Sequence, residues 1–411
     1  MKGKVAWLVP APLRGSGGHR TIFQNVTALA AAGCECHVFL EAPGPAAEYD
    51  SPLTAKELVE RWFGPVPATF HLGYELDRDF DVAFATAWFT AEPLKWAERA
   101  RSKAYFIQDY EAYFMPMSDG FIQAENTFRY QFHGTTIGRW LTARLGRDFD
   151  MACSPFDFCA DRSVYRPLAH IERELAVCFV YQPEKPRRCS IVGGQALAIV
   201  KHEMPEVKIY FYGNDQPAHL DYEVRHLGLI PIESCNELYN RSTVGLCISA
   251  TNPSRVPFEM MAAGLPVVDI HRENNLYDMP EDAVLLAEPT PESIASALLE
   301  ILRNPTAQRA RGRAGIDFMR DRDLQHGFDQ FTAFTERLID GPTAVSEPIV
   351  PTKLYKRPPA TAPRHLLPRY ATVLRGAHHE DAKNDPIARA SAFVTRAQRK
   401  LEQTLRRLYS R

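Results

Sequence analysis

The sequence predicts an α/β protein of two domains, each built on a parallel sheet covered by helices. Its 411 residues are 45% hydrophobic and 24% charged, and chains of this length divide into more than one hydrophobic core. Short apolar runs alternate with helical patterns in two separate series, which is typical of parallel sheets flanked by helices. We therefore expect a first domain at residues 1–170, a second at 171–340, and a separate segment at 341–411.

Four apolar runs in the first domain have the length of strands, and two stretches between them have the period of helices. The strands are expected at Val5–Val9, Cys36–Leu40, Val82–Ala85 and Ala104–Ile107. The helices are expected at His19–Ala32, where Gly33 marks the end, and at Ala91–Ala100.

The second domain repeats this alternation. Its strands are expected at Leu175–Val180, Val207–Tyr212, Val244–Ser249 and Pro266–Ile270, the last preceded by a short helix at Glu259–Ala263. Glu292–Leu302 predicts one helix, and Ala307–Leu338 predicts one or two more. Because open α/β sheets bind ligands at the carboxyl ends of their strands, two such domains facing each other predict a site in a central cleft.

The C-terminal segment differs in composition from the rest of the chain. From Gly341 to Pro368 it is rich in proline, and we expect no folded core there. In Pro386–Arg411, apolar residues recur every three or four positions, with basic residues between them. This is the pattern of a basic amphipathic helix. Residues 342–411 carry 14 Lys and Arg against 5 Asp and Glu. We expect residues 386–411 to contact an anionic membrane, with packing on the body or on a partner as the alternative.

Several classes of protein are excluded by the composition. No run of eighteen apolar residues predicts a membrane span, and Met1–Pro10 lacks the pattern of a secretion signal. The eight cysteines have neither metal-ligand nor disulfide spacing, so we expect reduced thiols in a reducing cytosol. The body is acidic and carries no nucleic-acid recognition motif. The expected location is the cytoplasm, with a peripheral place at the inner face of the membrane as a further expectation.

A glycine-rich turn follows the first strand and leads into the first helix. In R-G-S-G-G-H-R-T, from Arg14 to Thr21, Gly17 and Gly18 let backbone N–H groups approach an anion at the positive end of the helix dipole. We expect these glycines, with His19 and Arg20, to face a phosphate; a tight strand-to-helix turn is the alternative. A nicotinamide cofactor is disfavoured because Arg20 replaces the third glycine of its motif.

A basic turn follows the first strand of the second domain. Lys185, Arg187 and Arg188 stand together in P-E-K-P-R-R, at the carboxyl end of that strand. Arginine offers a planar, two-pronged donor and lysine a point charge, which together suit a diphosphate. A solvated basic turn is the alternative.

The most specific motif is S-A-T-N-P-S-R-V-P-F-E-M-M-A-A-G-L-P-V-V-D, from Ser249 to Asp269. From Glu259 to Val268 it resembles the donor-binding segment of retaining glycosyltransferases of family 4, whose form is close to E-A-M-A-x-G-x-P-V-V and whose fold, GT-B, has two Rossmann-like domains. Glu259 at a helix start can accept hydrogen bonds from ribose hydroxyls, while neighbouring N–H groups face the diphosphate. A buried cap of that helix is the alternative.

The chain departs from the family pattern at one position. The pattern has two glutamates eight positions apart, and Thr251 stands eight before Glu259. The resemblance implies that Thr251 or Asn252 takes over the role of the first glutamate at the sugar.

A narrower branch is also similar, over about residues 1–340. The segments Thr251–Ala262, Phe106–Phe114 and Gly15–Thr21 resemble rhamnosyltransferases of bacterial surface-polysaccharide assembly, which use dTDP-L-rhamnose. In that branch an arginine often stands where this chain has Gln182, so the diphosphate contact is expected to rest on Arg187 and Arg188.

Two carboxylates end a strand of the first domain and should point into the cleft. Asp109 and Glu111 in Q-D-Y-E are expected to bind acceptor hydroxyls or to orient the attacking one, with solvated caps as the alternative. Three D-x-D pairs, at Asp77–Asp79, Asp148–Asp150 and Asp321–Asp323, do not follow strands in a fitting context. We therefore expect no metal, because cations and dipoles stabilise the leaving diphosphate.

The resemblance implies a specific reaction. A hexosyl group, L-rhamnose from dTDP-L-rhamnose, passes with retention to a glycan or lipid-linked glycan acceptor in O-antigen, capsule or S-layer glycan biosynthesis, without a cofactor. A GDP-mannose or UDP-hexose donor and a catalytically silent sugar-nucleotide-binding assembly protein are the alternatives. The expected catalytic residues are Asp109, Glu111, Arg187 and Arg188; the expected donor-binding residues are Gly17, Gly18, His19, Arg20, Lys185, Arg187, Arg188, Thr251, Asn252, Ser254 and Glu259.

Overall fold

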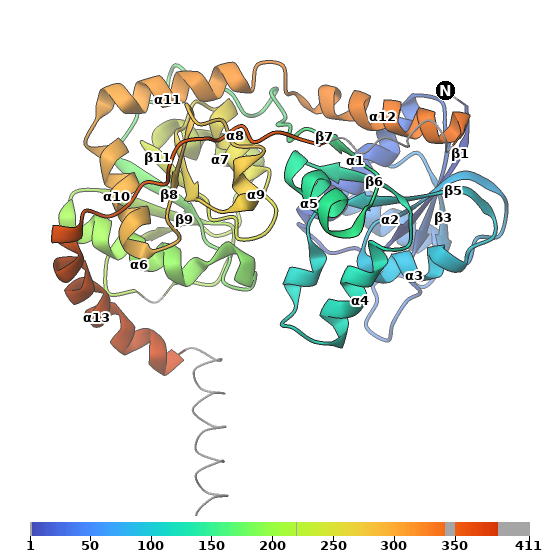
Figure 1. The fold of residues 1–411 in the computed structure, drawn as a ribbon, viewed down its shortest axis with the longest axis horizontal. Helices are drawn as coiled ribbons and strands as arrows, with labels where there is room; N and C mark the ends of the chain where they lie inside the picture. Colours follow the sequence, from blue (N-terminus) through green and yellow to red (C-terminus); the bar gives the residue numbers. More distant parts are fainter. Residues whose placement is uncertain (1, 219, 342–349, 385–411) are drawn as a thin grey trace, which may run out of the picture.

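The computed structural model describes residues 2–218, 220–341 and 350–384, and two parallel sheets organise them (Figure 1). The first sheet has seven strands in the order β3-β2-β1-β4-β5-β6-β7, and the second has six in the order β10-β9-β8-β11-β12-β13. Every strand pair within both sheets is parallel. The expected α/β fold with two Rossmann-like domains is therefore confirmed.

The first sheet is built from the hydrophobic runs seen in the sequence. In β1 the residues Val5 to Val9 are fully buried, as expected for a central strand covered by helices on both faces. The strands are β1 Lys4–Val9, β2 Glu35–Leu40, β3 Thr69–Leu72, β4 Phe80–Ala85, β5 Ala100–Ile107, β6 His133–Ile137 and β7 Cys153–Phe156. The helices are α1 Gly17–Ala31, α2 Pro52–Phe63, α3 Trp88–Trp96, the 3-10 turn η1 Glu111–Phe114, α4 Asp119–Thr127 and α5 Arg139–Phe149.

The second sheet begins at β8 and alternates with helices in the same way. Its strands are β8 Ala176–Val180, β9 Lys208–Tyr212, β10 Arg225–His226, β11 Val244–Leu246, β12 Val267–Ile270 and β13 Val284–Ala287. Its helices are the 3-10 turn η2 Pro186–Arg188, α6 Ser190–Glu203, α7 Ile232–Arg241, α8 Val256–Ala262, α9 Glu273–Leu276, α10 Pro291–Leu302 and α11 Pro305–Phe318.

Some element boundaries differ from the sequence expectations. The helix expected at Ala91–Ala100 spans Trp88–Trp96 instead, and Ala100 already begins β5. The helix carrying Glu259 begins three residues early, at Val256, because Pro257 fits the first turn of a helix. The strand expected to reach Ser249 ends at Leu246, since the following residues turn toward the first domain.

The last long helix of the folded body returns to the first domain. Helix α12, Leu324–Asp340, follows α11, and the two helices run along one side of the molecule from the second domain to the first (Figure 1). The ring of Phe331 lies 5.6 Å from that of Trp7 and 5.4 Å from that of Phe106, both in the first sheet. The range 171–340 expected for the second domain thus contains a helix that packs on the first, because the apolar face of α12 fits that core.

Residues 350–368 of the proline-rich segment pack against the second domain, although no folded core was expected from Gly341 to Pro368. The backbone N–H of Tyr355 donates to the carbonyl of Leu276 at 2.9 Å, and its hydroxyl accepts from the N–H of Leu286 at 3.2 Å. Ala360 pairs with Ala287 of β13. The prolines prevent a helix here, but the extended chain still adds to a sheet edge.

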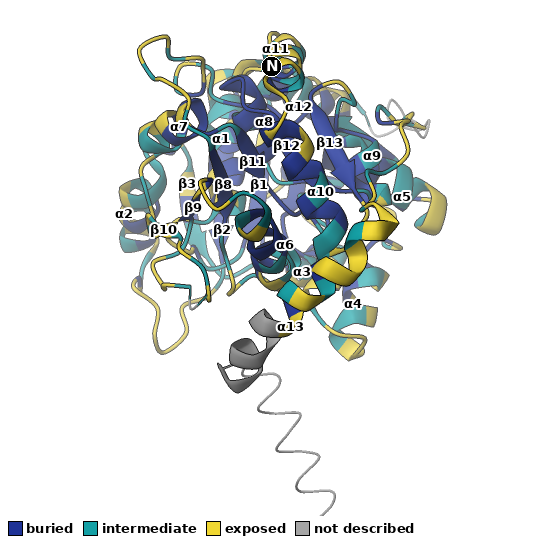
Figure 2. Ribbon diagram, turned by 90° about the vertical axis from the view of Figure 1, so that its left-hand side faces the viewer, coloured by how far each residue is buried: buried dark blue, intermediate teal, exposed yellow. Residues whose placement is uncertain are grey.

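Helix α13, Leu367–Asn384, continues this segment and lies against α6, with Tyr370 buried between them. Figure 2 shows the outward side of its described part exposed to solvent. The amphipathic helix expected at 386–411 lies outside the described residues. No helix in the described ranges has both the length and the apolar character that crossing a membrane requires.

Candidate functional site

Loops at the carboxyl ends of strands meet between the two sheets. Gln108 and Asp109 follow β5 directly, and Thr251 and Asn252 lie in the loop after β11. The Asn252 side-chain amide donates to the carbonyls of Gln108 at 2.9 Å and of Ile137, the last residue of β6, at 3.0 Å. These expected site residues therefore lie where the domains touch, at the edge where α/β sheets place their ligands.

Asp109 binds the second domain through both carboxylate oxygens. Its Oδ2 accepts from the hydroxyl of Thr251 at 2.9 Å, and its Oδ1 accepts from the backbone N–H of Asn252 at 2.9 Å. Burial raises the pKa of Asp109, while these hydrogen bonds and the charges of Arg187 and Arg188 act in the opposite direction. The sequence placed Asp109 with the acceptor and Thr251 with the donor; the structure brings them into direct contact.

Arg187 and Arg188 lie on η2 beside this contact. The Arg187 Nε lies 3.7 Å from Asp109 Oδ2, and its guanidinium lies 4.4 Å from the centre of the Phe114 ring. Neither Arg187 Nε nor Arg188 Nη1 has a hydrogen-bond partner among the described residues, although both atoms are buried. A buried N–H without an acceptor costs free energy, so an anion that reached these atoms would bind favourably.

Glu111 opens η1 and reaches the first turn of α3. Its Oε2 accepts from the backbone N–H of Trp88 at 2.6 Å, which places a carboxyl group at the positive end of that helix. Burial raises the pKa of Glu111 to about 8, and the nearby charge of Asp109 adds to the rise. Both carboxylates expected in Q-D-Y-E are thus partly buried groups with elevated pKa values, and neither is a solvated cap.

The glycine-rich turn begins α1. Ser16 is the N-cap, and its hydroxyl accepts from the backbone N–H of His19 at 3.3 Å. Apart from its chain neighbours and its own helix backbone, no atom of the described residues lies within 4 Å of where a Cβ of Gly17 would stand. A Cβ of Gly18 would meet the side chain of Gln108 at 3.6 Å. This helix end therefore adjoins Gln108 and is open at Gly17. Burial lowers the pKa of His19, whose ring contacts Ser16 and the carbonyl of Pro10.

Glu259 lies in the first turn of α8, with cations from both domains near it. Burial raises its pKa, while the charges of Arg255 and Arg20 and the hydroxyl of Tyr165 lower it. The guanidinium of Arg255 also reaches α1, where its Nη1 lies 3.3 Å from Thr21 Oγ1. Glu259 and the start of α1 therefore face one region, and exposed Arg20 contributes its charge to it.

Two residues expected to bind the sugar donor, Lys185 and Ser254, contact residues one or two positions away in the chain. Lys185 Nζ lies 3.8 Å from Glu184 Oε1, and the side chain is partly exposed. The hydroxyl of Ser254 accepts from the backbone N–H of Val256 at 3.2 Å and so supports the start of α8. Ser254 thus has a structural role in this arrangement, whereas the Lys185 ammonium retains capacity for an anion.

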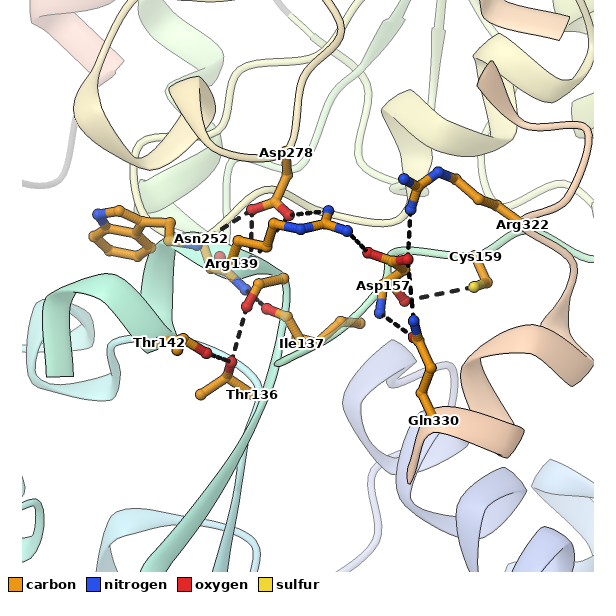
Figure 3. A network of polar contacts seen from close by, with 12 residues as sticks. Thr136, Ile137, Arg139, Thr142, Asp157, Cys159, Asn252, Asp278, Arg322 and Gln330 are labelled. Carbon is orange, nitrogen blue, oxygen red and sulfur yellow. Dashed lines mark hydrogen bonds and ion pairs between the residues drawn. The ribbon is translucent and has the colours of Figure 1, made fainter. Parts of the chain in front are cut away.

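A polar network that the sequence did not suggest joins the domains next to this site (Figure 3). The Arg139 guanidinium lies between two buried carboxylates, with Nη2 2.5 Å from Asp157 Oδ1 and Nη1 3.6 Å from Asp278 Oδ1. Arg322 approaches Asp157 from the other side at 2.8 Å. These residues lie in separate segments without motif spacing, so no local pattern could have predicted the network.

Asp269 is a further buried acid that the sequence left without a role, although it ends the quoted motif. Its Oδ1 accepts from the backbone N–H groups of Ser249 at 2.9 Å and Ile270 at 2.7 Å. Burial raises its pKa to about 7, and the charge of Arg188 opposes that rise. An aspartate inside an otherwise apolar strand, V-V-D-I, is the signal that could have identified it.

In each of the three D-x-D pairs, which have the spacing of a metal-binding motif, an aspartate forms an ion pair or caps a helix. Asp77 pairs with Arg78 at 2.8 Å, Asp148 pairs with Arg147 at 2.7 Å, and Asp323 caps α12. In the described part of the chain, no three or more His, Cys, Asp and Glu side chains are grouped so that they could hold a metal ion.

The two facing Rossmann-like domains define the GT-B fold, which glycosyltransferases use. Residues 175–299 match the family described as WsaF, C-terminal domain. The O-antigen biosynthesis protein RfbC of Myxococcus xanthus is 32% identical over 239 residues, which cover 56% of this chain and 19% of that protein. The chain thus spans about a fifth of the curated relative it matches.

Two solved structures have the same fold. Sucrose-phosphate synthase of Thermosynechococcus elongatus has a TM-score of 0.63 at 15% identity, over 82% of this chain and 99% of that one. HepE of Anabaena, in complex with UDP and glucose, has a TM-score of 0.63 at 13% identity, over 81% and 99%. At these identities the likeness establishes the fold alone.

Proposed function

We propose that this protein is a glycosyltransferase that takes a hexosyl group from a nucleoside diphosphate sugar bound between the two domains. One observation carries the proposal: at the domain junction, Arg187 and Arg188 present buried N–H groups that have no acceptor within the described ranges of the chain. The charge of Glu259 lies on the same side of the second domain, close to the start of α1. Cations for a diphosphate and a carboxylate for ribose hydroxyls are the groups that such a donor requires.

The proposed chemistry depends on charge separation. As the bond between the anomeric carbon and the phosphate oxygen stretches, positive charge grows on the sugar and negative charge on the diphosphate. Arg187, Arg188 and the dipole of α1 are fixed before the reaction, so they stabilise the leaving group most in the transition state. This mechanism needs no metal or other cofactor, and we expect a chelator to leave turnover unchanged.

For the donor we propose dTDP-L-rhamnose. Support comes from the motif similarity to surface-polysaccharide rhamnosyltransferases and from the O-antigen biosynthesis protein that matches more than half of the chain. UDP-glucose and GDP-mannose are the competing donors, because the diphosphate expected at Arg187 and Arg188 and the nucleoside 3′-hydroxyl expected at Glu259 are common to all three. HepE, which has the same fold, binds UDP and glucose.

The acceptor we propose is a glycan or lipid-linked glycan of a surface polysaccharide, and the expected stereochemical outcome is retention. Glu111 and the aromatic residues of η1 lie on the first-domain side of the site, where the acceptor is expected to enter. The cytoplasmic location and the membrane contact through residues 386–411 remain predictions.

The test is a turnover assay with the purified chain. Release of nucleoside diphosphate from dTDP-L-rhamnose, UDP-glucose and GDP-mannose is measured separately, with and without rhamnan oligosaccharides as acceptors. Preferred turnover of dTDP-L-rhamnose that depends on the acceptor supports the proposed class and donor, and preference for another donor retains the class but changes the sugar. Tight binding of a donor without any release would favour the silent assembly protein.

A further inference from the structure

The carboxylate of Asp109 belongs to the first domain but is bound by the second. Thr251 Oγ1 donates to its Oδ2 and the Asn252 N–H donates to its Oδ1, both at 2.9 Å. The backbone N–H of Tyr110 donates to Oδ1 at 2.8 Å. Only 13% of the Asp109 side chain is exposed, so little of the carboxylate remains in contact with water.

The hydrogen bonds leave one position of this carboxylate open. A carboxylate has about four acceptor positions, two on each oxygen. Tyr110 and Asn252 fill both positions of Oδ1, whereas Thr251 fills one position of Oδ2. Arg187 Nε lies 3.7 Å from Oδ2, which is an ion-pair distance and too long for a hydrogen bond. Oδ2 can therefore accept one more hydrogen bond, next to the cations proposed to hold the diphosphate.

The same geometry explains the residue at position 251. Its hydroxyl points at the Asp109 carboxylate and donates a hydrogen bond to it. A glutamate at 251 would bring a second carboxylate against the first at a partly buried place, where two like charges repel strongly. Threonine, whose hydroxyl donates, is compatible with an ionised Asp109, and an ionised glutamate, which only accepts, is not.

We propose that Asp109 of the first domain, held by Thr251 and Asn252, is the carboxylate that accepts a hydrogen bond from a hydroxyl of the donor hexose. The assignment rests on the proposed function, and it replaces the expectation that Thr251 or Asn252 binds the sugar directly. Since Asp109 reaches this place only when the two domains touch, the sugar part of the donor is bound by both domains. The nucleotide part is bound chiefly by the second.

Calorimetry on the full chain measures how much the nucleotide part and the sugar part of the donor each contribute to the affinity. Each variant is titrated with a nucleoside diphosphate and with the corresponding nucleoside diphosphate sugar, using dTDP with dTDP-L-rhamnose, UDP with UDP-glucose and GDP with GDP-mannose. In Asp109→Asn we expect the affinity for the sugar-bearing ligand to fall about tenfold or more, since a hydrogen bond to a charged group is lost. The affinity for the nucleoside diphosphate should change much less.

A charge exchange across the junction sharpens the test. Thr251→Glu should lose the additional affinity that the hexose gives to the sugar-bearing ligand, as Asp109→Asn does, because two carboxylates then oppose each other. The double variant Asp109→Asn/Thr251→Glu should regain part of it, since a single carboxylate is restored at the junction. Thr251→Val, which keeps the shape of the side chain, should show an intermediate loss and serves if another variant does not fold.

Asp79→Asn is the matched control, because the Asp79 side chain is 90% exposed and precedes β4, at the opposite edge of the sheet from the strand end that carries Asp109. The inference is overturned if Asp109→Asn weakens both ligands equally, which would make Asp109 a domain contact alone, or if it weakens neither. Absence of binding by the wild-type chain to all six ligands would instead reject the proposed function, and the inference with it.

Discussion

The carboxylate of Asp278, in the second domain, accepts the backbone N–H of Arg139, the first residue of α5 in the first domain, at 3.0 Å from each oxygen. The N–H of Trp140 donates to the same group at 3.3 Å. An acidic side chain from one domain thus acts as the cap of a helix in the other. The Asp278 carboxylate lies so close to Gly138, the N-cap of α5, that a Cβ at this position would stand only 2.9 Å from Oδ2.

We expect Asp278→Ala to lower the free energy of unfolding by about 2 kcal/mol, since it leaves two helix-end N–H groups without an acceptor. Chemical denaturation measures this change, and hydrogen exchange at Arg139 and Trp140 should accelerate. Asp282→Ala is the control, because Asp282 is 72% exposed and forms a surface pair with Arg357. It should change stability by no more than about 0.5 kcal/mol. Equal effects of the two variants would contradict the cap.

The ionisation of Glu111 should contribute to the pH dependence of the free energy of unfolding. Its pKa rises from 4.5 in the unfolded chain to about 8 in the folded protein. The folded state therefore binds more protons between these values, and stability falls as pH rises from about 4.5 through about 8. Glu111→Gln stays neutral, so its stability should fall less across this range.

Urea unfolding between pH 5 and pH 8.5 tests this, with the exposed Glu75→Gln as control. Parallel curves for wild type and Glu111→Gln would show that Glu111 does not hold an elevated pKa.

The segment around Tyr355 should contribute to the second domain. Tyr355 is 2% exposed, and we expect Tyr355→Ala to cost about 3 kcal/mol or more through the cavity it leaves. Tyr355→Phe removes only the hydroxyl that accepts from Leu286, at a cost of about 1 kcal/mol. Thermal or urea unfolding gives both values. Val350→Ala, at a residue 83% exposed, is the control, and similar results for all three would mean that the segment does not pack as described.

The two arginines of η2 should act on turnover without affecting the fold. Arg187→Ala and Arg188→Ala each remove a cation proposed to stabilise the leaving diphosphate, and we expect kcat to fall about a hundredfold or more. Circular dichroism and the melting temperature should stay close to wild type. Exposed Arg225→Ala is the matched control. Unchanged turnover in both single variants would remove these residues from the mechanism.

The sequence predicts the fold well because a continuous hydrophobic run indicates a strand that is buried on both faces. The central strands β1, β2, β4 and β5 were found, since they are continuous apolar runs. Strand β6, with the sequence H-G-T-T-I, was missed because its buried threonines look polar. The segment around Tyr355 was missed for a related reason: prolines mark the absence of a helix but not the absence of packing.

The site was predicted less completely, because its contacts join distant segments. The sequence identified Asp109 and Thr251 separately, and only the fold shows that they bind each other across 142 positions. Local signals identified Arg187, Arg188 and Glu259 as candidates, because they lie at strand and helix ends, and their roles at a donor stay predictions. Asp157, Asp278 and Arg139 have no such signal, because nothing within a few residues of each reveals its partners.

The central claim is that the junction binds a nucleoside diphosphate through Glu259 and the η2 arginines. Titration calorimetry of dTDP into wild type, Glu259→Ala and the exposed control Glu75→Ala tests it most directly. We predict binding by wild type and Glu75→Ala and an affinity at least about tenfold weaker for Glu259→Ala, since its carboxylate is proposed to accept a hydrogen bond from the 3′-hydroxyl of the deoxyribose. Equal affinity for all three proteins would contradict the proposed site.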